Sequence, residues 1–144
     1  MYDRILVPTD GSEGTAETLE HAVHAARQDD ATVHVLYVVD QRRYLAADAD
    51  TQDDVVATLE AEGEEAVETA AERVREAGLD AVTDLRQGVP HREIVDYAGE
   101  VSADLVVMGA HGRTGRDRLA ALGSVTERVL EGVDVPVLVV DIAN

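Results

Sequence analysis

The sequence of 144 residues contains no cysteine, lysine, phenylalanine or tryptophan. The lack of cysteine excludes disulfides and thiolate-ligated metal sites, and it favours a reducing compartment. The lack of lysine excludes the phosphate loop Gly-x4-Gly-Lys-Ser/Thr. No apolar run approaches the roughly 20 residues that a membrane-spanning helix needs, and the N-terminus shows no signal-peptide pattern. We therefore expect a cytoplasmic protein with no membrane partner.

Positive charge is also scarce, because 12 arginines face 30 aspartates and glutamates, which leaves a net charge of −18. Nucleic acids and anionic membranes bind basic surfaces, so neither is expected as a partner. Molar salt would screen the repulsion among so many carboxylates. The composition thus predicts adaptation to high salt, as in a halophilic archaeon. The alternative is an ordinary acidic surface.

Short apolar runs alternate with longer segments of helical periodicity along the whole chain. The runs predict strands at residues 4–7, 32–39, 80–86, 105–108 and 135–140, and the periodic segments predict helices at residues 12–28, 53–77, 88–101 and 124–131. Residues 41–52 show no period and are predicted to form a surface loop.

Most of the predicted strands are unbroken runs of valine, leucine and isoleucine. Such strands are buried on both faces, which is typical of a parallel sheet covered by helices. Residues 80–86 instead alternate polar and apolar side chains and should form a half-buried edge strand. We predict one α/β domain over residues 1–144, a Rossmann-like, doubly wound, five-stranded parallel sheet of order 3-2-1-4-5 with helices on both faces.

In a sheet of that order, ligands lie beyond the carboxyl ends of the strands, at the point where the strand order reverses. One of the two strands at that point ends at Pro8, Thr9 and Asp10, and the other ends at Met108 and Gly109. Two separate parts of the sequence therefore predict the same crevice.

Glycines and arginines gather after the fourth predicted strand. The stretch contains Gly109, Gly112, Gly115 and Gly123, the cations Arg113, Arg116 and Arg118, and finally Ser124, which opens a helix. Glycines leave backbone N–H groups accessible, and a helix N-terminus attracts anions. The stretch predicts a ligand that carries phosphate. Turn formation and the capping box from Ser124 to Glu127 explain the same residues without a ligand.

Several motifs resemble those of the universal stress proteins, over essentially the whole chain. They are Ile5-Leu-Val-Pro-Thr-Asp-Gly-Ser12, Gly88-Val-Pro90, Val107-Met-Gly-Ala-His-Gly-Arg-Thr-Gly115, Gly123-Ser-Val-Thr-Glu-Arg-Val129 and Val135-Pro-Val-Leu-Val-Val140. The resemblance implies a Rossmann-like domain and a homodimer that pairs antiparallel through the last strand, Val135 to Asp141. For one branch of the family it also implies binding of ATP or AMP, with or without Mg²⁺.

The nucleotide motif of that branch, Gly-x2-Gly-x9-Gly-Ser/Thr, implies a set of nucleotide-binding residues here. They are Pro8, Thr9, Asp10, Val38, Met108, Gly109, Gly112, Arg113, Gly123, Ser124 and Val125. By the same resemblance, Asp10 accepts a hydrogen bond from the ligand and Val38 contacts the base. Ten residues rather than nine separate Gly112 from Gly123, and we interpret the extra residue as a bulge in a loop.

Other side chains offer weaker candidate sites. His21 and His24 could share a helix face, but no third metal ligand is near them, and His34 is predicted to be a hydrogen-bonded core residue. The aspartates at positions 48–54 lack the glycine and glutamate of a calcium-binding loop. His111 either contacts the ligand or shapes its loop. No catalytic and no metal-binding residue is predicted.

Three functions remain open from the sequence. The leading prediction is a dimeric stress protein that binds ATP or AMP and acts through nucleotide-dependent contacts with an unidentified protein. The second is a dimeric scaffold of the same fold that binds no nucleotide. The third, and the least favoured, is a slow ATPase.

Overall fold

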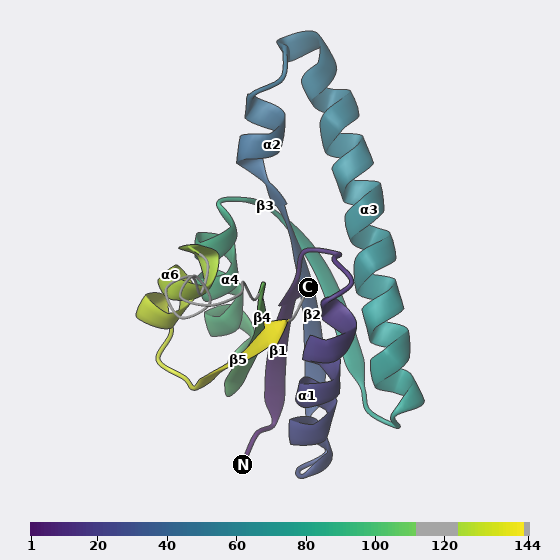
Figure 1. Cartoon of the computed structure of the whole chain (residues 1–144), viewed down its shortest axis with the longest axis vertical. Helices are drawn as coiled ribbons and strands as arrows, with labels where there is room; N and C mark the ends of the chain where they lie inside the picture. Colours follow the sequence, from purple (N-terminus) through teal and green to yellow (C-terminus); the bar gives the residue numbers. More distant parts are fainter. Residues whose placement is uncertain (112–123, 143–144) are drawn as a thin grey trace.

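The computed structural model describes residues 1–111 and 124–142 (Figure 1). In chain order, the elements are β1 (Arg4–Thr9), α1 (Thr15–Arg27), β2 (Thr32–Asp40), α2 (Gln41–Leu45), α3 (Ala49–Glu76), β3 (Ala81–Gly88), α4 (Pro90–Val101), β4 (Leu105–His111), α6 (Ser124–Gly132) and β5 (Val137–Ile142). No helix in these two ranges is long and apolar enough to cross a membrane.

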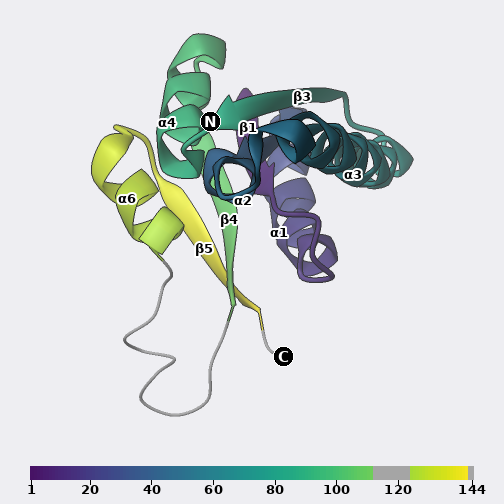
Figure 2. The ribbon, with the colours of Figure 1, turned by 90° about the horizontal axis from the view of Figure 1, so that it is seen from above.

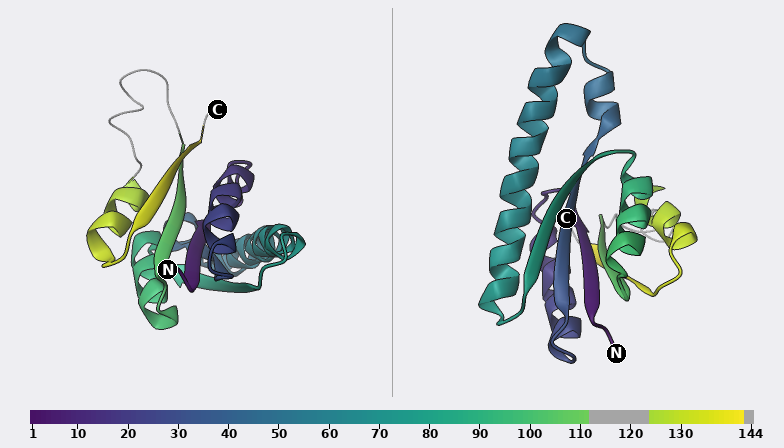
Figure 3. Two further views of the ribbon diagram at one scale, coloured as in Figure 1. Left: turned by 90° about the horizontal axis from the view of Figure 1, so that it is seen from below. Right: turned by 180° about the vertical axis from the view of Figure 1, so that it is seen from behind.

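The five strands form one parallel sheet of order β3-β2-β1-β4-β5. Helices α1 and α3 cover one face of the sheet, and α4 and α6 cover the other (Figure 2). The same two layers are visible from below and from behind (Figure 3). The predicted fold class and strand order are confirmed.

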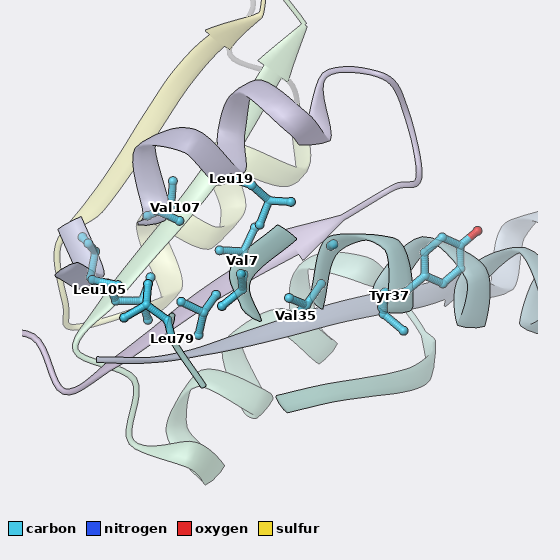
Figure 4. Packing of buried hydrophobic residues seen from close by; sticks show 14 of the residues in the cluster. Val7, Leu19, Val35, Tyr37, Leu79, Leu105 and Val107 are labelled. Atoms are coloured by element: carbon cyan, nitrogen blue, oxygen red, sulfur yellow. The ribbon is translucent and has the colours of Figure 1, made fainter. Parts of the chain in front are cut away.

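Unbroken apolar strands produce this two-faced core. Successive side chains of a strand point to opposite faces, so Ile5 and Val7 pack under α1 and α3 while Leu6 packs under α4 and α6. Leu19 of α1 joins Val7 and Val107 in the first of these clusters (Figure 4). At the edge of the sheet, β3 contains no fully buried residue, as its alternating sequence predicts.

The prediction of a surface loop over residues 41–52 is wrong, because this segment forms α2 and the start of α3. Asp40 caps α2 by accepting a hydrogen bond from the backbone N–H of Arg42 at 3.0 Å. Gln52 donates from Nε2 to the carbonyl of Ala47 at 3.0 Å and closes the turn before α3. No side chain of α2 is buried, so the segment lacks the apolar period by which helices are recognised. Figure 1 shows that both helices extend beyond the sheet.

The remaining differences concern element ends. The last strand begins at Val137 rather than at residue 135, and it continues to Ile142. The carbonyl of Pro136 already accepts a hydrogen bond from Val106 N–H at 3.0 Å, so the chain reaches the sheet before the strand proper begins. Gly78 follows α3 with φ of +82°, a conformation that favours glycine and ends the helix where predicted.

Candidate functional site

A cleft of about 510 Å³ lies at the carboxyl ends of β1, β2 and β4, where the strand order reverses. The starts of α2, α4 and α6 and the end of β5 complete its walls. Eight residues predicted for the site line this one cleft: Pro8, Thr9, Asp10, Val38, Met108, Gly109, Ser124 and Val125. Three others, Gly112, Arg113 and Gly123, lie outside the described residues, as does the side chain of His111.

The loop after β1 is held by local hydrogen bonds. Thr9 Oγ1 and Thr15 Oγ1 lie 2.7 Å apart, and Thr9 Oγ1 accepts from the N–H of Gly11 at 3.0 Å. Asp10 Oδ1 accepts from the N–H of Ser12 at 2.9 Å. Gly11 has φ of +79°, a backbone conformation that residues with a side chain rarely adopt. These bonds fix two hydroxyls and one carboxylate along the wall of the cleft.

Gly109, at the end of β4, is required by packing. A Cβ atom at this position would overlap Cδ1 of Ile142 and would lie 2.7 Å from Oγ1 of Thr18. Ile142 belongs to β5, and Thr18 is a buried residue of α1. The glycine therefore allows β4, β5 and α1 to approach one another, and this requirement holds with or without a ligand.

The start of α6 forms the wall opposite the loop after β1. Ser124 is exposed and Val125 is half-buried, and both line the cleft. The first N–H groups of a helix have no partner within the helix and carry partial positive charge. Together with the backbone of Gly109, this wall can receive an anionic group.

The structure adds charged residues that the sequence analysis missed. Asp40, Arg42 and Arg43 line the cleft from the end of β2 and from α2. Strand β2 is not one of the two strands at which the order reverses, but it pairs in parallel with β1, so its carboxyl end lies at the same edge of the sheet. Pro90 and Ile94 of α4 add an apolar wall on the same side.

Arg42 and Asp40, which both line the cleft, form an ion pair. Nε of Arg42 lies 3.0 and 3.1 Å from the two carboxylate oxygens of Asp40, and one terminal nitrogen lies 2.5 Å from Oδ2. Hydrogen bonds from Arg42 hold the pKa of Asp40 below its usual range, and the same bonds raise the pKa of Arg42. Both side chains are therefore charged at neutral pH.

The other candidate residues lie away from the cleft. His21 and His24 are exposed on α1, and residues 1–110 and 124–142 contain no group of three or more histidines, aspartates or glutamates placed to hold a metal ion. His34 is a core residue, as predicted, with Nδ1 3.4 Å from the hydroxyl of Tyr97. Burial lowers the pKa of His34, which favours its neutral form.

Proteins of known family resemble this chain over nearly its whole length. Universal stress protein MJ0531 of Methanocaldococcus jannaschii is 40% identical over 141 residues, which cover 97% of this chain and 82% of that protein. The structure of MJ0577 from the same organism is 32% identical with a TM-score of 0.87, covering 100% of this chain and 99% of the other.

A more distant structure shares the fold. A universal stress protein from Archaeoglobus fulgidus in complex with dAMP has a TM-score of 0.73 at 24% identity, and the match covers 97% of this chain and 98% of that one. The sequence profile of the universal stress protein family matches residues 1–141. Fold, motifs and profile agree, and the chain belongs to the universal stress protein family.

Proposed function

We propose that this chain is a nucleotide-binding universal stress protein of the cytoplasm that holds ATP or AMP in the cleft at the carboxyl end of the sheet. One observation carries the proposal: segments at residues 8–10, 108–109 and 124–125, far apart in sequence, line a single cleft. Its volume of about 510 Å³ lies in the range of small-molecule sites, roughly 300–1,000 Å³.

Each wall of the cleft suits a different part of an adenine nucleotide. Val38 and Met108 offer apolar contacts to a base. Thr9 and Asp10 offer hydrogen-bonding groups to a ribose. The N-terminus of α6 with Ser124, continued by Gly112, Arg113 and Gly123 of the connecting segment, would receive the phosphates. Any Mg²⁺ would be held mainly by phosphate oxygens.

We further propose that the protein is a homodimer through the strand from Val135 to Asp141. The two edges of the sheet differ in chemistry. On β3, Arg86 pairs with Glu100 at 2.7 Å and with Asp84 at 3.4 Å, and charges of this kind discourage strand pairing. On β5, Leu138 is 39% exposed between two half-buried valines. An apolar edge of this kind favours a second copy of the chain as its cover.

The packing around Gly109 supports a second candidate function. Because Ile142 and Thr18 account for this glycine without a ligand, a dimeric scaffold that binds no nucleotide needs the same residue. The two candidates differ in affinity for nucleotide and not in fold. Slow ATP hydrolysis would be a further activity of the nucleotide-binding candidate, and a turnover assay would detect it.

Calorimetric titration with ATP and with AMP at molar salt separates the two candidates. We expect binding by the wild type, and we expect Ser124→Ala to weaken it by about 1.5–3 kcal/mol, on the order of ten- to a hundredfold, through loss of a charge-assisted hydrogen bond. Thr58→Ala, which removes an exposed hydroxyl of α3, is the matched control. If the wild type binds neither nucleotide at millimolar concentration, the nucleotide-binding candidate is rejected and the scaffold candidate remains.

A further inference from the structure

Helix α2 is held in a fixed position above the cleft. Its first turn is capped by Asp40, and the guanidinium of Arg42 donates hydrogen bonds to the same carboxylate. Tyr44 packs against the buried cluster under α1 and α3. Gln52 of α3 closes the turn that follows through the carbonyl of Ala47. A short helix bound at both ends in this way presents its remaining side chains in a defined direction.

Arg43 is the cation that this arrangement presents. It is exposed, and it lines both the cleft and a second hollow of about 440 Å³ between the loop after β1 and α3. Within residues 1–111 and 124–142, no ion pair or side-chain hydrogen bond involves Arg43, whereas the neighbouring Arg42 is paired with Asp40. Its charge acts on Asp40 only through space.

The charges of the second hollow make that side unfavourable for an anion. Arg43 and Arg73 line the second hollow together with four carboxylates, those of Asp10, Glu13, Glu62 and Glu65. The carboxylates outnumber the guanidiniums there. Asp10 lines both hollows and so does not distinguish them. An anionic group near Arg43 is therefore more stable on the cleft side, where the other carboxylate, Asp40, is neutralised by Arg42.

We propose that Arg43 binds an anionic group of the nucleotide held in the cleft, so that the site selects phosphorylated nucleosides over the uncharged nucleoside. This inference rests on the proposed nucleotide-binding function. A polyanion approaching a chain of net charge −18 meets repulsion, and a guanidinium in the lining of the cleft opposes that repulsion locally. The α6 wall and Arg43 then act on the ligand from two sides.

The test compares adenosine, AMP and ATP as ligands of the wild type, Arg43→Gln and Arg27→Gln by calorimetry. Arg27 is an exposed arginine at the end of α1, outside both hollows, so its substitution makes the same change in net charge elsewhere. We expect Arg43→Gln to weaken ATP binding about fivefold, as for a solvent-accessible charge pair, and to leave adenosine binding unchanged. Arg43→Lys should recover part of the loss.

Two results would overturn the role of Arg43 while leaving nucleotide binding intact. One is equal ATP affinity for Arg43→Gln and Arg27→Gln. The other is an equal loss of adenosine and ATP affinity, which would indicate a role in shaping the cleft. An equal loss in Arg73→Gln would place the anion in the second hollow and would also contradict the proposal. If the wild type binds neither ATP nor AMP, the proposed function fails first, and this inference fails with it.

Discussion

Among single residues, Gly109 is the position where a predicted role in ligand binding coincides with a packing requirement. The sequence predicts it as a ligand-facing glycine, and it does line the cleft. Its lack of a side chain is also demanded by Ile142 and Thr18, which occupy the space that a Cβ atom would take. A glycine in a binding motif therefore does not by itself distinguish a working site from a retained fold.

Substitution of Gly109 by alanine should destabilise the fold even without nucleotide. Overpacking against Ile142 and Thr18 is expected to cost about 1–3 kcal/mol of the free energy of unfolding, measured by urea denaturation. Gly99→Ala is the control, because Gly99 lies in α4 with nothing within 4 Å of an added Cβ, and the exchange should stabilise by about 0.5–1 kcal/mol. If the two substitutions changed the free energy of unfolding equally, the close packing at Gly109 would have no effect on stability.

The buried His34 should make stability depend on pH. Burial, and to a lesser degree the charge of Arg4, lower its pKa in the folded state below the unfolded value of about 6.5. The unfolded chain therefore takes up a proton first as pH falls, and stability is lost from about pH 6.5 downward. The difference in unfolding free energy between wild type and His34→Gln should vary with pH below that point and be constant above it. A difference that is constant throughout would mean that His34 does not titrate on unfolding.

At the scale of elements, the sequence predicted whatever contributes to the core. Unbroken apolar runs identified β1, β2 and β4, because strands buried on both faces are apolar along their whole length. The order of the sheet was predicted from the doubly wound Rossmann-like topology. Helix α2 was missed because none of its side chains is buried and polar caps hold it. Arg42 and Arg43 belong to α2, so they were not assigned to the cleft while this segment was predicted to be a surface loop.

The two edge strands predict different responses to a new charge. If the proposed dimer forms through β5, Leu138→Arg should convert it to a monomer, because a guanidinium at each copy of an antiparallel strand pair repels its counterpart. Val82→Arg on β3, where the side chain is 43% exposed, should leave the mass unchanged. Light scattering measures both. A dimer that survives Leu138→Arg, or one that is lost only in Val82→Arg, would exclude β5 as the interface.

At the scale of the whole molecule, charge is the dominant feature. With 30 acidic residues and 12 arginines, ion pairing one to one is impossible. Helix α3 carries much of the excess negative charge, because its 28 residues include ten carboxylates and two arginines, Arg73 and Arg75. The Debye length falls from about 10 Å at 0.1 M salt to about 3 Å at 1 M, so repulsion between turns of this helix is largely removed by molar salt.

The thermal midpoint of unfolding should therefore rise steeply between 0.1 M and 2 M potassium chloride. Screening relieves repulsion that the compact state suffers more than the extended chain does. Scanning calorimetry across this range measures the effect. A midpoint that stays flat would remove the basis for adaptation to high salt and would leave an ordinary acidic surface.

Residues from β1, β2, β4 and α6 are proposed to form one nucleotide site. A crystal structure determined after soaking with ATP at saturating concentration tests this proposal. We predict adenine between Val38 and Met108, ribose beside Asp10, and phosphates at the N-terminus of α6. A cleft without ligand density, or ATP bound elsewhere on the molecule, would show that these residues do not form the nucleotide site.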